Sequence, residues 1–175
     1  SGMQITGGAN VRKDFTPEGT HITVGAAVKV TNFANWLFNI QHSSKSYVPA
    51  VRLTPVGDGR FFISIDGSPA SDIFSTFIMH ANTWYYLELS SRIRNAVSGT
   101  DTYAETSATF KANNESIGSV LSTATNTTYK LSGTDTFSYA SLQLQGPGGG
   151  HNAVYDDLYI NVSAGEDFSG DVRVD

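Results

Sequence analysis

The sequence contains no cysteine, few charged residues and no long hydrophobic run. Without cysteine it lacks the disulfide framework that supports many small secreted domains. Charged residues make up only 15% of its 175 residues, less than coiled coils, helical bundles or disordered chains usually carry. No apolar run approaches the roughly 20 residues that cross a bilayer. We therefore expect neither a transmembrane helix nor a membrane partner.

Positive charge is also scarce, and it is scattered along the chain. There are 11 lysines and arginines against 16 acidic residues, which gives a formal net charge of −5. No basic run is longer than Arg12–Lys13. Because a protein that binds the phosphate backbone needs a clustered basic face, we expect no nucleic-acid partner.

Hydroxyl side chains, glycine and short alternating segments are abundant. The chain has 20 serines, 18 threonines and 17 glycines. Segments such as His21–Val30, Arg60–Asp66 and Tyr155–Val162 alternate apolar and polar residues, which is typical of strands covered on one face. Ile73–Met79 is rich in β-branched and aromatic residues, so we expect a strand there as well.

Turn sequences separate these segments. Gly57-Asp58-Gly59 indicates a turn, and Asn113-Asn114 predicts a tight hairpin because asparagine tolerates positive φ. Gly146–Gly150 is expected to be a loop. A phase change within Phe137–Gln145 indicates a bulge. Together these patterns predict roughly ten to thirteen short strands, no helix and one all-β domain over residues 1–175. We expect a two-sheet antiparallel jelly-roll sandwich.

Three segments resemble a known family. They are Asn82–Leu89 (Asn-Thr-Trp-Tyr-Tyr-Leu-Glu-Leu), Tyr155–Ile160 (Tyr-Asp-Asp-Leu-Tyr-Ile) and Asp167–Val174 (Asp-Phe-Ser-Gly-Asp-Val-Arg-Val). In this order they resemble the concanavalin A-like lectin/glucanase superfamily, in the laminin-G-like form found in structural proteins of tailed bacteriophages. The family's opening strand, upstream of Gly7-Gly8, is not matched. Either the domain lacks that strand or Met3–Val11 supplies it.

The resemblance implies a non-enzymatic virion domain that decorates a capsid or forms part of a tail or fibre. Such a domain would assemble in the host cytoplasm and would have other virion subunits as partners, as a homo-oligomer or bound to the capsid. An alternative is a lectin-like adhesin module that binds bacterial surface polysaccharide. The two roles are compatible, since a fold alone does not determine a function.

A glucanase is a third and more remote alternative. It would need two carboxylates that point into one cleft, which on a strand stand two or four positions apart. No acidic residues stand two apart, and those four apart fall in predicted loops or termini: Asp14/Glu18, Asp101/Glu105, Asp167/Asp171 and Asp171/Asp175. The histidines are widely spaced, so no zinc site is indicated. We expect no catalytic residue and no cofactor.

Asp156 and Asp157 are the acidic residues best suited to a metal, and calcium is the cation that such hard oxygen ligands favour. The structural alternative follows from strand phase, which places Asp156 toward the core with Ile160 and Val162. There its carboxylate would accept N–H bonds from the Gly146–Gly150 loop. Because calcium usually takes six or more oxygens, we favour the structural role and expect no metal.

Aromatic side chains could stack on a sugar ring. The candidate glycan-binding residues are Trp36, Tyr47, Tyr129, Tyr139 and His151. The alternative is packing within the sandwich, since aromatic residues make up an ordinary 11% of the chain. Trp84, on the same strand face as Tyr86 and Glu88, is expected to pack at the edge of the core.

Overall fold

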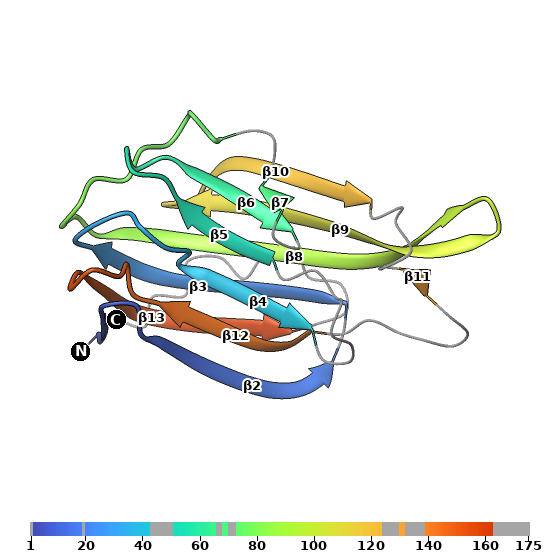
Figure 1. Cartoon of the computed structure of the whole chain (residues 1–175), viewed down its shortest axis with the longest axis horizontal. Helices are drawn as coiled ribbons and strands as arrows, with labels where there is room; N and C mark the ends of the chain where they lie inside the picture. The colour runs from blue at the N-terminus through green and yellow to red at the C-terminus, as the bar shows by residue number, and fades with distance from the viewer. Residues whose placement is uncertain are drawn as a thin grey trace.

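The protein is a sandwich of two antiparallel β-sheets (Figure 1). A computed structural model of the chain describes residues 2–18, 20–42, 51–65, 68–69, 73–123, 130–131 and 139–162. These residues contain thirteen strands and no helix, and so no helix that could cross a membrane. The all-β class expected from alternation is confirmed.

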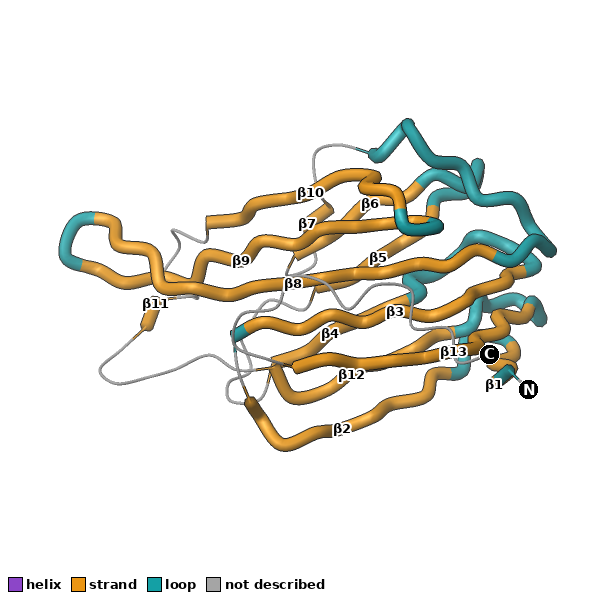
Figure 2. The backbone as a smooth tube through the Cα atoms, turned by 180° about the vertical axis from the view of Figure 1, so that it is seen from behind, coloured by secondary structure: helices purple, strands orange, loops and turns teal. Residues whose placement is uncertain are grey.

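The first sheet has seven strands, and Figure 2 shows it from its outer side. In spatial order the strands are β1 (Met3–Thr6), β13 (Asn152–Val162), β3 (His21–Val30), β8 (Tyr85–Ser98), β9 (Asp101–Ala112) and β10 (Glu115–Thr123), and β11 (Lys130–Leu131) also pairs with β9. All the pairings in this sheet are antiparallel.

The second sheet has six strands and lies in front of the first in Figure 1. In spatial order they are β2 (Asn10–Glu18), β12 (Tyr139–Gln145), β4 (Phe38–His42), β5 (Val51–Pro55), β6 (Phe61–Ile65) and β7 (Ser68–Pro69). Successive strands therefore alternate between the sheets at both the start and the end of the chain, as in a jelly roll.

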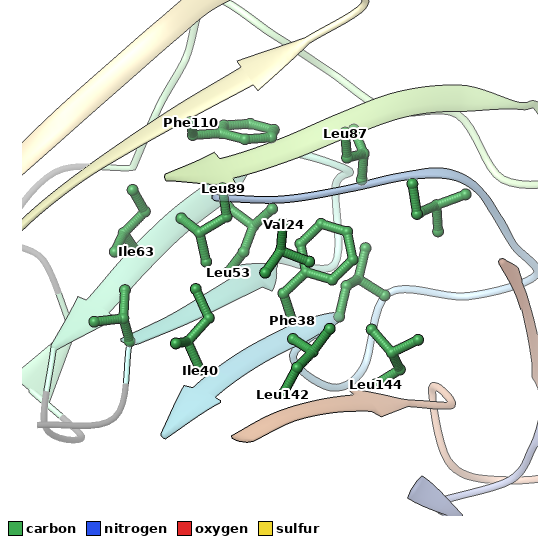
Figure 3. Packing of buried hydrophobic residues seen from close by; sticks show 14 of the residues in the cluster. Val24, Phe38, Ile40, Leu53, Ile63, Leu87, Leu89, Phe110, Leu142 and Leu144 are labelled. Atoms are coloured by element: carbon green, nitrogen blue, oxygen red, sulfur yellow. The ribbon is translucent and has the colours of Figure 1, made fainter. Parts of the chain in front are cut away.

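Apolar side chains from the two inner faces meet in one core. Figure 3 shows side chains of both sheets facing one another. Those from the seven-stranded sheet include Val24, Leu87, Leu89 and Phe110, and those from the six-stranded sheet include Phe38, Ile40, Leu53, Ile63, Leu142 and Leu144. Each strand contributes alternate residues, because successive side chains point to opposite faces.

The N-terminal residues supply an outer strand to each sheet. β1 pairs with β13, and β2 pairs with β12. Between them, the N–H groups of Gly146 and Gly148 donate to the carbonyls of Ala9 and Gly7, at 3.0 Å each. β1 therefore lies beside the first four residues of β13, from Asn152 to Tyr155.

The turn predictions are confirmed. Asn113 and Asn114 both have positive φ, 49° and 67°, and they connect β9 to β10 in a two-residue hairpin. Gly59 has a φ of 85° and ends the turn between β5 and β6. A side chain at Gly59 would place its Cβ 2.1 Å from the carbonyl oxygen of Met79, so the position requires glycine.

The predicted strand over Ile73–Met79 is wrong. Within this segment Phe74 forms only an isolated bridge to Phe61, and Met79 donates its N–H to Gly59. Phe74 and Phe77 both pack against the ring of Phe110, with centroids 6.2 and 5.9 Å away. Residues three apart cannot share one face of a regular strand, so core packing overrides the local β propensity.

The hairpin of β8 and β9 extends beyond the rest of the sandwich in both views (Figures 1 and 2). β3 pairs with β8 only as far as Arg92, whereas β9 remains paired with β8 to Ser98. His21, the first residue of β3, lies opposite Arg92 at the base of this extension.

Candidate functional site

The outer face of the seven-stranded sheet carries a row of polar side chains on each of its central strands. Leu87 and Leu89 of β8 point into the core, so Glu88, Ser90 and Arg92 point outward. The register places Glu88 beside Lys111 of β9, and Arg92 beside His21 of β3. We refer to this surface as the polar face.

A groove with a volume of about 320 Å³ lies on the polar face, across β3, β8, β9 and β10. Its polar lining includes His21, Ser90, Arg92, Ser107, Thr109 and Lys111, and Ser116 of β10 also lines it. None of the residues that line the groove is acidic. The groove therefore offers hydroxyl groups and positively charged side chains to a ligand.

Hydrogen bonds hold the floor of the groove in place. The Nε2 atom of His21 lies 2.9 Å from the hydroxyl of Ser90, and that hydroxyl lies 3.1 Å from the hydroxyl of Thr23. All three residues are buried, with exposed fractions of 3%, 7% and 2%. Because a buried polar network restricts its members to few rotamers, the groove is preorganised at this point.

Glu88 is the most buried charged residue described on the polar face, with an exposed fraction of 1%. Its Oε2 accepts a hydrogen bond from the hydroxyl of Tyr159 on β13. Burial raises the pKa of Glu88 from 4.5 to about 6, although the Tyr159 hydrogen bond and the charge of Lys111 both lower it. Burial and the Glu88 hydrogen bond also raise the pKa of Tyr159. A solute cannot reach the carboxylate, so Glu88 acts as a structural acid.

Gly25 of β3 makes room for this cluster. It lies between Tyr159 on β13 and Glu88 on β8 in the register of the sheet. A Cβ there would lie 2.3 Å from a ring carbon of Tyr159 and 2.9 Å from the hydroxyl of Tyr86. The two tyrosines therefore occupy the space above Gly25.

Trp84 is also on the polar face, just before β8, and its exposed fraction is 45%. The Nζ of Lys29 lies 4.9 Å from the centre of its ring, within the range of a cation–π contact. The expectation that Trp84 packs at the core edge is wrong. Trp84 alternates with Tyr86 and Glu88, whose side chains lie on the outer face, so its ring also points to solvent. It gives the polar face an exposed aromatic ring.

A bulge in β13 changes the predicted position of Asp156. The register passes from Asp156 opposite Ala27 to Tyr159 opposite Gly25, so β13 has one more residue than β3 at this point. Ala27 and Gly25 are on the same outer face of β3. Asp156 and Tyr159 therefore both point outward, and the prediction that Asp156 faces the core is wrong.

The predicted contact between Asp156 and the glycine loop is replaced by a local one. The Oδ1 of Asp156 accepts the backbone N–H of Asp157 at 3.1 Å, and Asp157 itself has a φ of 51°. In the described part of the chain, no group of three His, Cys, Asp or Glu side chains is placed to hold a metal ion. The loop is instead held by the backbone of Gly7 and Ala9.

The five aromatic candidates for glycan binding do not form one site. Tyr139 is fully buried and its hydroxyl lies 2.8 Å from that of Ser91, so its candidacy for sugar stacking is wrong. Trp36 is half-buried before β4, and His151 is exposed before β13; neither lines the groove. Tyr47 and Tyr129 lie outside the described residues.

Two of the acidic residues considered for a glucanase have described side chains, Asp14 and Glu105, and they lie on different sheets. Asp14 is paired with Arg12, Nε to Oδ1, at 2.5 Å on the second sheet. Glu105 is paired with Arg94 on the hairpin of β8 and β9. Asp167, Asp171 and Asp175 lie outside the described residues, as does the third family motif.

Sequence reasoning missed the groove residues, although part of the pattern was present. Alternation along β8 places Glu88, Ser90 and Arg92 on one face, opposite to Leu87 and Leu89. What the sequence could not show is which residues of β3, β9 and β10 lie beside them. That depends on strand register, which brings together residues far apart in the chain, such as His21 and Ser90, which are 69 positions apart.

Comparison with known proteins supports the fold. No family model and no curated protein matches the sequence. A heptameric SAP-like pentraxin from Limulus polyphemus has a TM-score of 0.52 at 12% identity, over 90% of this chain and 74% of the pentraxin. Botulinum neurotoxin type C has a TM-score of 0.52 at 8% identity, over 93% of this chain and 39% of the toxin.

A family 7 alginate lyase, in complex with its substrate, has a TM-score of 0.51 at 15% identity. That comparison covers 86% of this chain and 65% of the lyase. The chain thus has the predicted two-sheet jelly-roll sandwich and shares this fold with the pentraxin and the lyase. At these identities the likeness concerns the fold.

Proposed function

We propose that this chain is a lectin-like module that binds a glycan on its polar face without acting on it chemically. The observation that carries this proposal is the groove. Hydroxyl groups of Ser90, Ser107 and Thr109 line it together with cationic side chains. Sugar hydroxyls exchange hydrogen bonds with such groups, and a few fixed polar groups are typical of small-ligand sites.

Trp84 supports the same proposal. An exposed ring can stack on the apolar face of a pyranose, whereas a ring buried in the core cannot. Trp84 and Arg92 are eight residues apart on one strand face, so about 26 Å separates them along the sheet. The polar face is long enough for an oligosaccharide.

Two of the proteins that share this fold, the neurotoxin and the alginate lyase, have known ligands. Cell entry of the neurotoxin depends on its interaction with two ganglioside molecules, and the structure of the lyase is a complex with substrate. These descriptions concern those proteins, and they fit a lectin-like role here.

A glycan array followed by titration tests the proposal. The variant Thr109→Trp places a large side chain in the groove, and Thr54→Trp makes the same change on the outer face of the second sheet. We expect glycan binding that is abolished by Thr109→Trp and retained by Thr54→Trp. An array without any bound glycan, both with and without calcium, would contradict the proposal.

The absence of catalysis is part of the proposal. Glu88 has a raised pKa of the kind often found in active sites, but it is buried away from the groove. We expect no hydrolysis of a β-glucan panel by the purified chain. Hydrolysis that is lost on mutation of Asp101, Glu105, Asp167 or Asp171 would establish the glucanase alternative instead.

We also propose that the module belongs to a virion of a tailed bacteriophage, as a capsid or tail component. The support is the motif resemblance, two parts of which the structure describes. Asn82–Leu89 leads into central strand β8, and Tyr155–Ile160 contains the β13 bulge, so both contribute side chains to the polar face. Mass spectrometry of purified particles tests this role. A gene located among metabolic genes, away from capsid or tail genes, would contradict it.

A further inference from the structure

The charge of the groove is opposite to that of the whole chain. The chain has a formal net charge of −5, yet Arg92 and Lys111 line the groove and no acidic residue does. A surface that concentrates scarce cations favours an anionic ligand, because the field in a groove is focused by its low-dielectric walls.

The two cationic residues of the groove, Arg92 and Lys111, lie at different positions along the strands. Lys111 pairs with Glu88, whereas Arg92 is four residues further along β8 and pairs with Ser107. At the rise of a β-strand, about 13 Å separates the two levels. Ser90 and Thr109, which pair with each other, lie between them. Along the strands, the cation Lys111 is therefore followed by a pair of hydroxyl residues and then by the cation Arg92.

We propose that the groove binds an acidic oligosaccharide, with carboxylates of separate uronate residues at Arg92 and Lys111 and a sugar hydroxyl at the exposed Thr109. This inference rests on the proposed glycan-binding function and names the class of glycan. Arginine and lysine both form charge-assisted hydrogen bonds with carboxylates, and these are stronger than the hydrogen bonds of neutral groups.

The hydroxyl groups between the cations favour a sugar over a nucleic acid. Binding to a phosphate backbone depends mainly on lysine and arginine contacts along a strand. Single-stranded nucleic acid also needs aromatic rings on which successive bases stack. The residues that line the groove include no aromatic ring other than the imidazole of buried His21.

Calorimetric titration of the purified chain with four ligands tests the inference. The ligands are a tetrauronate, the same tetrasaccharide with its carboxyl groups reduced to alcohols, the monouronate and a single-stranded oligonucleotide of equal charge. We expect the tetrauronate to bind at least about tenfold more tightly than its reduced form, since tenfold corresponds to one modest charge-assisted bond. The monouronate should bind weakly, because it cannot reach both cations.

Variants test whether Arg92 and Lys111 cause the tighter binding of the tetrauronate. Arg92→Gln and Lys111→Gln should each lower the affinity for the tetrauronate by about tenfold and should lower the affinity for the reduced form by much less. Arg12→Gln, on the second sheet, is the matched control and should change neither. Thermal unfolding of each variant verifies that it is folded.

Three results would overturn the inference in distinguishable ways. Equal binding of the tetrauronate and its reduced form would leave a glycan-binding module whose ligand is not acidic. Equal or tighter binding of the oligonucleotide would indicate a general polyanion site. Binding of none of the saccharides, together with an empty glycan array, would reject the proposed function itself.

Discussion

Glu88 combines three features at one residue: a central position in the sheet, near-complete burial and a hydrogen bond from Tyr159. Its pKa of about 6 lies above its ordinary value of 4.5, because burial disfavours the charged form more than its partners favour it. The folded protein therefore binds this proton more tightly than the unfolded chain does. The contribution of Glu88 to the free energy of unfolding is therefore most favourable at low pH, where the carboxyl group is protonated in both states.

The first prediction follows from that linkage. As the pH rises from about 4.5 to 6, the folded state must give up a proton that it holds more tightly, so the free energy of unfolding falls. The contribution of Glu88 is about 2 kcal/mol over its whole titration, from pH values below 4.5 to values above 6. Urea unfolding of the wild type and Glu88→Gln at several pH values measures it. The glutamine variant, whose amide oxygen can still accept from Tyr159, should lack this fall. Parallel pH profiles for the two proteins would refute the prediction.

Gly25 is the second residue for which we predict the effect of a substitution on stability. The Gly25→Ala variant would force the ring of Tyr159 and the hydroxyl of Tyr86 to move, because its Cβ would lie within 3 Å of both. Overpacking of this kind costs about 1–3 kcal/mol. Gly8→Ala, where no heavy atom lies within 4 Å of the added Cβ, is the matched control. Equal stability of the two variants in thermal unfolding would mean that the cluster above Gly25 is loosely packed.

At the scale of elements, the bulge in β13 decides what the polar face contains. Without the extra residue, strict alternation would place Tyr159 on the same face as Tyr155, which points into the core. The bulge returns Tyr159 to the outer face, where it reaches Glu88. Asp157 makes this possible by adopting a φ of 51°.

The third prediction tests that role of Asp157. Asparagine and glycine tolerate positive φ, so Asp157→Asn and Asp157→Gly should retain wild-type stability within about 0.5 kcal/mol. A β-branched residue is disfavoured there, so Asp157→Val should cost about 1–2 kcal/mol. Chemical denaturation of the three variants compares them. A valine variant as stable as the glycine variant would mean that the bulge does not require this conformation.

The bulge also shows which parts of the structure could be predicted from the sequence. The Asn113-Asn114 hairpin was predictable because neighbouring residues determine a two-residue turn. The phase of β3 was predictable because its apolar residues alternate without interruption. The β13 bulge was not, since Asp156-Asp157-Leu158 has no glycine and nothing local that distinguishes a bulge from a continuous strand. The polar face depends on that bulge and on four strands in register, so only its β8 residues were visible in the sequence.

At the scale of the whole molecule, two buried tyrosines connect the sheets. Tyr139 of β12 lies in the six-stranded sheet, and its hydroxyl meets Ser91 of β8 at 2.8 Å. Tyr155 of β13 lies in the seven-stranded sheet, and its one hydroxyl proton lies between the carbonyl oxygens of Gln145, at 2.8 Å from the hydroxyl oxygen, and Leu37, at 3.2 Å. Burial raises the pKa of both hydroxyls, so both stay protonated and able to donate.

These two contacts predict how the sandwich responds when either is removed. In Tyr139→Phe the hydroxyl of Ser91 still donates to the carbonyl of Ser107 at 3.0 Å, so the loss should be about 1 kcal/mol. Tyr155→Phe removes the one donor that the carbonyl oxygens of Gln145 and Leu37 share and should cost more, about 1–3 kcal/mol. Urea unfolding of each variant measures both losses.

Because one core joins the sheets, both variants should unfold in a single transition with the wild-type dependence on urea concentration. A second transition in either variant would show that the sheets unfold independently. A larger loss for Tyr139→Phe than for Tyr155→Phe would show that the contact with Ser91 is the stronger connection.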